Sequence, residues 1–242
     1  MKTISLRNML LDRLHVEAIC NPQMFEASFT PAWLSQWLNP ALHTSTRLIG
    51  LRLITSMLHG SQSFSRAFAA SGGWKWLADV LSDGFISSEV VYLLVAMLFG
   101  LPASSVPSKA RSDFCDLNNL FPPEKMAVAN PDSLYCLTAV LKGAMEEFME
   151  AKNQRFSFLP ISALSGSDES VRLVESQRKQ RKPQSQPSVE NVIDRTVQRL
   201  ADMASLGVIV SYLALSFEAN EQIRNFLSSE TGVERLVGMM YP

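Results

Sequence analysis

The chain has 242 residues, enough for one sizeable hydrophobic core or one short array of helical repeats. Its residues are 47% hydrophobic and 19% charged, and its net charge of −1 excludes a general attraction to nucleic acid or anionic lipid. The most apolar run, residues 90–99, is too short to span a bilayer, and charges interrupt the N-terminal stretch that a signal peptide would need. We expect a cytoplasmic protein whose membrane association is at most indirect.

The first predicted element is an amphipathic helix over residues 4–19. Its apolar side chains recur at helical spacing, with charged side chains between them. The helix should end before Asn21 and Pro22, because a proline disfavours helical geometry in the residue that precedes it. The next element is a short helix that Thr30 caps and Pro31 begins.

Three further helices are expected between this short helix and the middle of the chain. One begins near Thr44 and stops at Gly60, and a second covers residues 61–70. Gly72 and Gly73 then break the chain before a tryptophan-bearing helix. The four tryptophans, at equivalent places in two units, favour packing between repeats over a binding hot spot; they are Trp33, Trp37, Trp74 and Trp76.

The stretch from Trp33 to Gly100 contains two copies of one sequence pattern. Residues 51–60 can be laid over residues 91–100 so that Leu53, Met57, Leu58 and Gly60 coincide with identical residues 40 positions later. A period of about 40 residues built from two or three helices is typical of armadillo and HEAT repeats, in which each unit buries its apolar face against a neighbour.

A third copy is indicated near the end of the chain. Residues 67–81 can be laid over residues 225–240 with one inserted residue. The phrase that starts at Asn220 resembles the armadillo consensus, in which a helix ending in an Arg-x-Phe run turns at glycine into the next apolar helix. Glycine permits a sharp turn, and the phenylalanine and leucines would fill the space between units.

Between these copies the pattern is less regular. Loops are expected at residues 101–107 and 121–123, and a strong helix from Asn130 through Met149. Residues 153–190 read as a disordered linker rich in serine, glutamine and basic residues. Helix returns over residues 189–217, with a break suggested at Gly207. The expected organisation is thus helical repeats over residues 1–152, the linker, and C-terminal helices over residues 191–242.

We find no pattern for catalysis or for a cofactor. The histidines fall in different elements, without ligand spacing; they are His15, His43 and His59. We interpret the three cysteines as reduced hydrophobic residues of the core; they are Cys20, Cys115 and Cys136. Glu146, Glu147 and Glu150 form a solvated helix face with Lys142 and Lys152. No metal, no cofactor and no enzymatic activity is expected.

The densest charge cluster lies in the predicted linker. Arg178, Lys179, Arg181 and Lys182 fit a nuclear-import signal, a contact for anionic lipid or a nucleic-acid patch. The run lacks the aromatic residues that stack on bases, and nearby acidic residues offset part of its charge. A plain solvated linker is therefore favoured, with these four residues as the candidate interaction or localisation site and no nucleic-acid partner.

One part of the chain resembles a known family. The run Trp37–Thr55, with its His-x-Ser-Thr segment, is followed by a phenylalanine-rich helix, by Gly73, and by the Glu-Val-x-Tyr segment that starts at Glu89. This order resembles the armadillo-like region of the giant BEACH/WD-repeat scaffold proteins, most closely the autophagy-linked FYVE branch. The resemblance covers about residues 30–107 and, more loosely, residues 212–240. The chain shows no BEACH domain, no FYVE finger and no WD repeats.

We therefore expect an all-α, armadillo/HEAT-like solenoid with a disordered insertion. The resemblance implies a non-enzymatic scaffold segment of a BEACH-type protein in vesicle trafficking or selective autophagy, which binds protein partners. A free-standing armadillo adaptor without a membrane role is the alternative, and an α-helical enzyme subunit is a remote one. The apolar composition also predicts self-association through exposed ends of the solenoid.

Overall fold

The computed structural model describes residues 2–26, 28–83, 85–107, 113–157, 189–229 and 232–234. All regular elements in these ranges are helices, which confirms the all-α class. The chain divides into two compact units. The first contains Met1–Glu146 and Ala201–Pro242, and the second contains Glu147–Leu200. Within the described ranges, no helix has both the length and the apolar character needed to cross a membrane.

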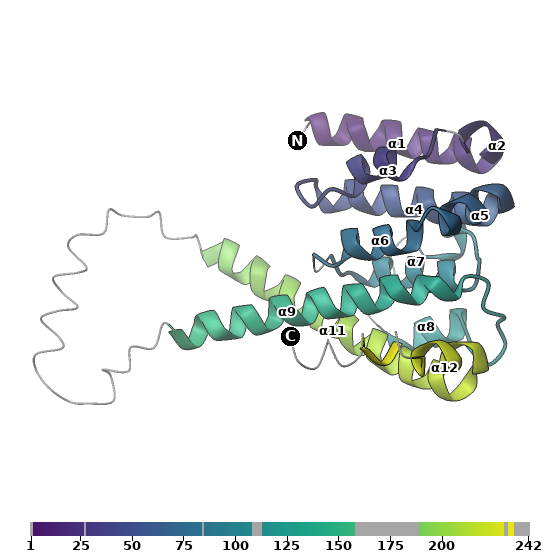
Figure 1. The fold of residues 1–242 in the computed structure, drawn as a ribbon. Coiled ribbons are helices and arrows are strands. Elements are labelled where there is room, and N and C mark those ends of the chain that lie inside the picture. The colour runs from purple at the N-terminus through teal and green to yellow at the C-terminus, as the bar shows by residue number, and fades with distance from the viewer. Residues whose placement is uncertain are drawn as a thin grey trace, which may run out of the picture. The chain divides into compact units, whose positions relative to one another are not determined.

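The helices follow one another in the order shown in Figure 1. They are α1 (Lys2–Cys20), α2 (Pro22–Phe25), α3 (Pro31–Leu38), α4 (Thr44–Gly60), α5 (Gln62–Ala70), α6 (Gly73–Leu81), α7 (Ser88–Leu98), η1 (Ala103–Ser105), α8 (Phe114–Leu120), η2 (Pro131–Ser133), α9 (Leu134–Ser157), α11 (Val189–Ala219) and α12 (Glu221–Leu227). The bounds predicted for α1, α3, α4, α5 and α6 hold to within one or two residues, whereas the short helix α2 was not predicted.

Side-chain caps explain why several helices begin where they do. Thr30 accepts a hydrogen bond from the backbone N–H of Trp33, which satisfies one free donor at the start of α3. Ser61 does the same for α5 and Ser87 for α7, each three residues ahead of the amide that it binds. These signals are local, and they are visible in the sequence.

The first unit is built as layers of helices. α4 packs between α1 and α7, and Figure 1 shows these three helices one above another. α7 is the centre of the core, because its side chains from Val90 to Leu98 are all buried. The most apolar run of the sequence is therefore the inside of a helical core.

The two halves of the 40-residue repeat occupy equivalent helices. Leu53 of α4 and Leu93 of α7 are both fully buried, and Met57 and Met97 are each at most 1% exposed. α3 and α5 each contact both α4 and α6. The sequence repeat thus corresponds to a repeat in burial.

The glycine turns of the second and third copies share a local geometry. A Cβ on Gly73 would lie 2.6 Å from the carbonyl oxygen of Phe68, and a Cβ on Gly232 would collide with the carbonyl oxygen of Phe226. In both turns a serine hydroxyl donates to that same phenylalanine carbonyl: Ser71 at 3.0 Å and Ser229 at 2.6 Å. The alignment with one inserted residue therefore describes a real structural correspondence.

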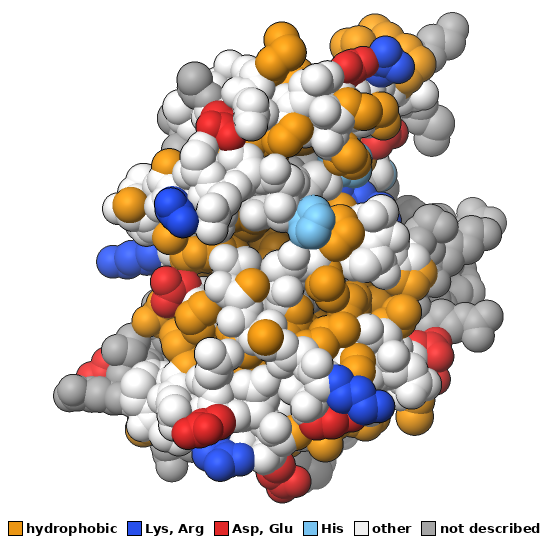
Figure 2. Space-filling model, turned by 90° about the vertical axis from the view of Figure 1, so that its right-hand side faces the viewer, with side chains coloured by type: hydrophobic (Ala, Val, Ile, Leu, Met, Phe, Trp, Pro, Cys, Tyr) orange, Lys and Arg blue, Asp and Glu red, His pale blue; other side chains and the backbone are white. Residues whose placement is uncertain are grey.

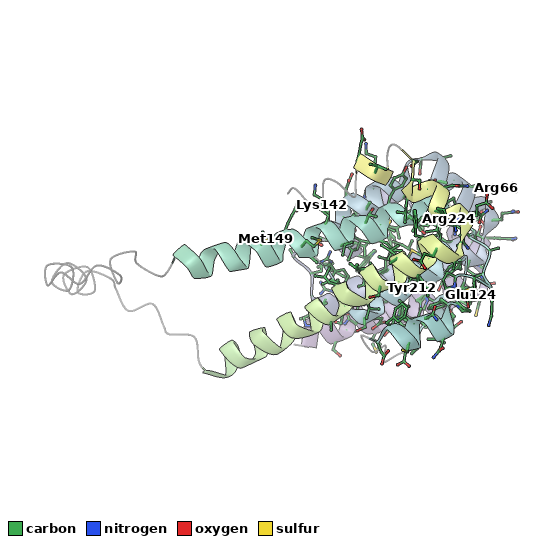
Figure 3. All side chains as sticks on the ribbon, turned by 90° about the horizontal axis from the view of Figure 1, so that it is seen from below. Arg66, Glu124, Lys142, Met149, Tyr212 and Arg224 are labelled. Atoms are coloured by element: carbon green, nitrogen blue, oxygen red, sulfur yellow. The ribbon has the colours of Figure 1, made fainter. Side chains whose placement is uncertain are left out.

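Polar contacts join the C-terminal helices to the rest of the first unit and to each other. The hydroxyl of Tyr212 on α11 donates to the carbonyl of Phe121, and the side-chain amide of Asn220 donates to the carbonyls of Pro123 and Met126. The guanidinium of Arg224 donates to two carbonyls at the end of α11; Tyr212 and Arg224 are labelled in Figure 3. Unpaired carbonyls at a helix end are satisfied in this way.

Two expectations from the sequence are wrong. α11 runs without a break through Gly207, since Val208 and Ile209 beside it are buried and hold the helix in place. We predicted that all three cysteines lie in the core, but only Cys136 does. Cys20 and Cys115 are exposed to solvent.

Candidate functional site

Polar side chains join α1 to α4. The Arg7 guanidinium donates to the hydroxyl of Thr46 at 3.1 Å, and that hydroxyl donates to the Oδ1 of Asn8 at 2.7 Å. Asn8 in turn donates its side-chain amide to the hydroxyl of Ser45 at 2.7 Å. Since Thr46 is fully buried, these bonds fix the register of α1 over α4.

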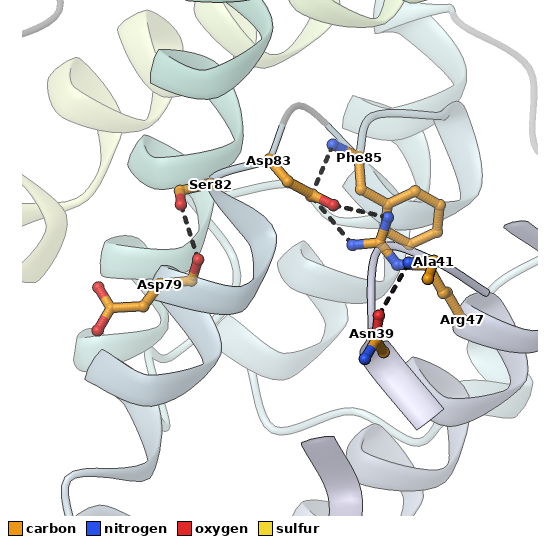
Figure 4. A network of polar contacts seen from close by, with 7 residues as sticks. All are labelled: Asn39, Ala41, Arg47, Asp79, Ser82, Asp83 and Phe85. Carbon is orange, nitrogen blue, oxygen red and sulfur yellow. Dashed lines mark hydrogen bonds and ion pairs between the residues drawn. The ribbon is translucent and has the colours of Figure 1, made fainter. Parts of the chain in front are cut away.

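A buried arginine joins α4 to the segment after α6. Arg47 is 5% exposed, and its two terminal nitrogens bind the two carboxylate oxygens of Asp83 at 2.9 and 3.0 Å (Figure 4). Its guanidinium carbon also lies 3.9 Å from the centre of the Phe85 ring. The same carboxylate accepts the backbone N–H of Phe85. A buried charge is tolerated when it is paired in this bidentate manner.

Two further contacts connect α4 to α7 and its C-terminal end. Arg52 binds Glu89 at 2.6 Å, with both side chains about one fifth exposed. The Nδ1 of His59 lies 2.7 Å from the carbonyl oxygen of Gly100, to which it donates. His59 is exposed and lies in the last turn of α4.

The partly buried His15 lies on α1, where its Nε2 is 2.8 Å from the hydroxyl of Ser56 on α4. Burial, together with the nearby charge of Arg52, lowers the pKa of His15 from its usual value. The imidazole therefore remains neutral in the fold at pH values where a free histidine is already protonated.

This histidine makes stability depend on pH. Because its folded pKa is depressed, the unfolded chain binds the additional proton, and the stabilisation present above about pH 6.5 is lost as the pH falls toward the folded pKa. We expect urea unfolding at pH 7.5 and 5.5 to give a lower free energy of unfolding at 5.5. The variant His15→Gln should show a weaker dependence over this interval, and an unchanged dependence would contradict the assignment.

A shallow cavity of about 440 Å³ lies between α2 and the start of α5. Its lining consists of Gln23, Glu26, Gly60, Ser61, Gln62 and Ser63. The hydroxyls of Ser61 and Ser63 both donate to the carboxylate of Glu26, and these two bonds lower the pKa of Glu26. Each carboxylate oxygen of Glu26 thus already accepts one serine hydrogen bond. The lining contains no histidine, cysteine or lysine.

The tryptophans pack against the core to different degrees. Trp74 is 4% exposed, whereas Trp33 and Trp76 are partly buried and pack against the core cluster. The rings of Phe29, Trp33 and Trp37 follow one another at centroid separations of 4.8 and 5.5 Å. These tryptophans therefore make packing contacts with the core, and Trp33 and Trp76 are only partly covered.

Several candidates for chemistry have ordinary surroundings. The thiol of Cys136 is buried and donates to the carbonyl of Trp74 at 3.6 Å. Lys142 and Glu146 form the expected exposed pair at 3.6 Å. In the part of the chain that the structure describes, no three His, Cys, Asp or Glu residues gather as metal ligands.

The basic run in the linker lies outside the described residues. This applies to Arg178, Lys179, Arg181 and Lys182, and to most of the linker predicted at residues 153–190. Helix α9 extends to Ser157 and α11 begins at Val189, so both expected edges of the linker fall inside helices. Both predicted helical parts, residues 1–152 and 191–242, contribute to the first unit.

Comparison with known proteins gives two partial matches. The chain is 31% identical over 107 residues to Protein SPIRRIG of Arabidopsis thaliana, and 27% identical over 106 residues to BEACH domain-containing protein A2 of the same plant. Each match covers 42% of this chain but only 3% of the relative, so the chain spans a very small part of either protein. No family model matches the chain, and no solved structure matches it with statistical significance. Part of the chain is thus distantly related to BEACH proteins.

Proposed function

We propose that this chain is a non-enzymatic scaffold segment of a BEACH-type protein, built from armadillo-like helical repeats that bind other proteins. The proposal rests on one observation: more than 100 residues of this chain are similar to a segment of each of two relatives. That segment is about 3% of the length of each relative. A segment of that kind acts as one section of a larger scaffold, and its place would be in vesicle trafficking or selective autophagy in the cytoplasm. Binding to membranes would be indirect.

Local geometry supports the repeat part of this proposal. The glycine turn at Gly73 and the turn at Gly232 have the same close approach to a phenylalanine carbonyl and the same serine contact. Polar contacts from α1 to α4, and from α4 to Asp83, to Glu89 of α7 and to Gly100, join residues that lie 36 to 41 positions apart. In a solenoid, similar contacts recur between neighbouring repeats and hold them as one rigid surface for partners.

An immunoblot of untagged source cells with an antibody against residues 160–190 tests the scaffold. We expect a band of several hundred kilodaltons, because the matched relatives are many times longer than this chain. A sole band near the 26.9 kDa of the chain itself would contradict the scaffold proposal and favour the free-standing adaptor.

The basic run provides a second test that separates these two outcomes. Changing Arg178, Lys179, Arg181 and Lys182 to glutamine should leave the intracellular position of a scaffold segment unchanged, because the rest of the scaffold holds it. A free-standing adaptor that depends on these charges would move. The matched control changes four exposed residues of the helical part, and it should leave the position unchanged in either case.

A further inference from the structure

Helix α11 leads into α12 in the same way that α4 leads into α5. One residue separates the helices in each pair, Ser61 in the first and Asn220 in the second. The side chain of that residue accepts the backbone N–H three positions further on, and its own backbone N–H donates to the carbonyl four positions before it. Positions on α4 and α11 can therefore be compared by counting back from these two caps.

One face of α4 and the matching face of α11 are equally buried. The positions four, seven and eight residues before the cap are at most 8% exposed in both helices. They are Leu53, Ile54 and Met57 in α4, and Tyr212, Leu213 and Ser216 in α11. The two helices thus present the same side to the core.

Another face is covered on α4 and exposed on α11. The positions three, six and ten residues before the cap of α4 are buried; they are Leu51 (0%), Thr55 (1%) and Leu58 (7%). The matching positions of α11 are all exposed; they are Val210 (52%), Ala214 and Phe217 (39%). We call these last three residues the outer row of α11. The equivalent positions of α7, which are Val91, Val95 and Leu98, are also buried.

Helix α7 covers this face of α4. Arg52 and His59 lie three positions before and four positions after Thr55, so they share its side of the helix. Arg52 donates to Glu89 at the start of α7, and His59 donates to the carbonyl of Gly100 after its end. α7 therefore runs along this side of α4, in the same direction.

We propose that the outer row of α11 is the docking surface for a further helix of the α7 kind, which the next repeat of the same scaffold supplies. The inference rests on the proposed scaffold function. The members of the row are four and three positions apart and form one apolar strip, whose burial is favourable. Figure 2 shows hydrophobic side chains among charged ones in the lower part of the molecule, at the height of α12 in Figure 1.

The residues beside the outer row specify the chemistry of the helix that covers it. Ser211 and Glu218 occupy the positions that Arg52 and His59 have on α4, and both are exposed. A helix that runs as α7 does would bring its last carbonyls close to the carboxylate of Glu218, which is unfavourable. The covering helix should therefore be apolar and carry a lysine or arginine in its last turn, where this cation meets both groups.

Site-specific photo-cross-linking in the full-length protein of the source cells tests the proposal. The variant Phe217→p-benzoylphenylalanine keeps an aromatic ring in the outer row. We expect a cross-link within the same polypeptide, to an apolar helix beyond residue 242 that has a basic residue in its last turn. The matched control, Asn225→p-benzoylphenylalanine, changes an exposed residue of α12 outside the row and should not reach that helix. No cross-link from position 217, a cross-link to residues 235–242 or to another polypeptide, or the same product from both positions would overturn the proposal.

A charge in the outer row provides a second readout. Val210→Asp should leave the urea midpoint of the 242-residue chain unchanged, because Val210 is exposed there. In the full-length protein it should abolish the cross-link from position 217, since it buries an unpaired carboxylate. An undiminished cross-link would overturn the proposal. The immunoblot described above separates two kinds of failure. A long band without the cross-link overturns this inference alone, whereas a sole short band contradicts the scaffold proposal as well.

Discussion

The variant Gly73→Ala should lower the free energy of unfolding by about 2–3 kcal/mol. The added Cβ would lie 2.6 Å from the carbonyl oxygen of Phe68 and 2.7 Å from the ring of the same residue. Neither group has room to move away, because Gly73 is buried at the start of α6 and Phe68 is 3% exposed in the core. Urea unfolding followed by circular dichroism measures the change.

Gly207→Ala is the matched control for this prediction. Gly207 lies inside α11, and a Cβ there would meet nothing within 4 Å. Alanine in a helix interior is favoured over glycine by about 0.5–1 kcal/mol, so this variant should be more stable than the wild type. If both variants changed stability in the same direction, the close approach at Gly73 would not be the cause.

The second large effect is expected at the ion pair between Arg47 and Asp83. Asp83→Ala should cost about 3 kcal/mol, because it leaves the charged side chain of Arg47, which is 7% exposed, without its carboxylate. The double variant Arg47→Met/Asp83→Ala should regain a large part of this loss, since it removes the unpaired charge and keeps an apolar side chain against Phe85. Thermal and urea unfolding of the wild type, the single variants Arg47→Met and Asp83→Ala, and the double variant give the coupling free energy.

An exposed ion pair serves as the comparison. Lys142→Ala removes one partner of a pair whose side chains are 48% and 43% exposed, and it should change stability by less than about 0.5 kcal/mol. A similar loss in both cases would mean that burial does not govern the contribution of Arg47. A double variant no more stable than Asp83→Ala alone would show that the guanidinium finds another partner.

The sequence alone determined where most helices begin and end, and it determined the repeat. Thr30 and Ser61 cap their helices within three residues, and Gly72, with φ of +75°, lets the chain turn from α5 into α6. These signals act between neighbours in the chain, so no knowledge of the packing is needed to find them. Leu53 and Leu93 occupy the same position of the 40-residue repeat, and both are fully buried.

Other features were decided by the tertiary structure. Gly207 stays inside a helix because Val208 and Ile209 are held in the core, whereas its local propensity favours a break. Arg47 is buried because Asp83, which is 36 residues away, lies beside it. The exposed positions of Cys20 and Cys115, and the exposed outer row of α11, likewise depend on which helix packs on which face. Burial and charge pairing are properties of contacts between distant segments, so a pattern within one segment cannot fix them.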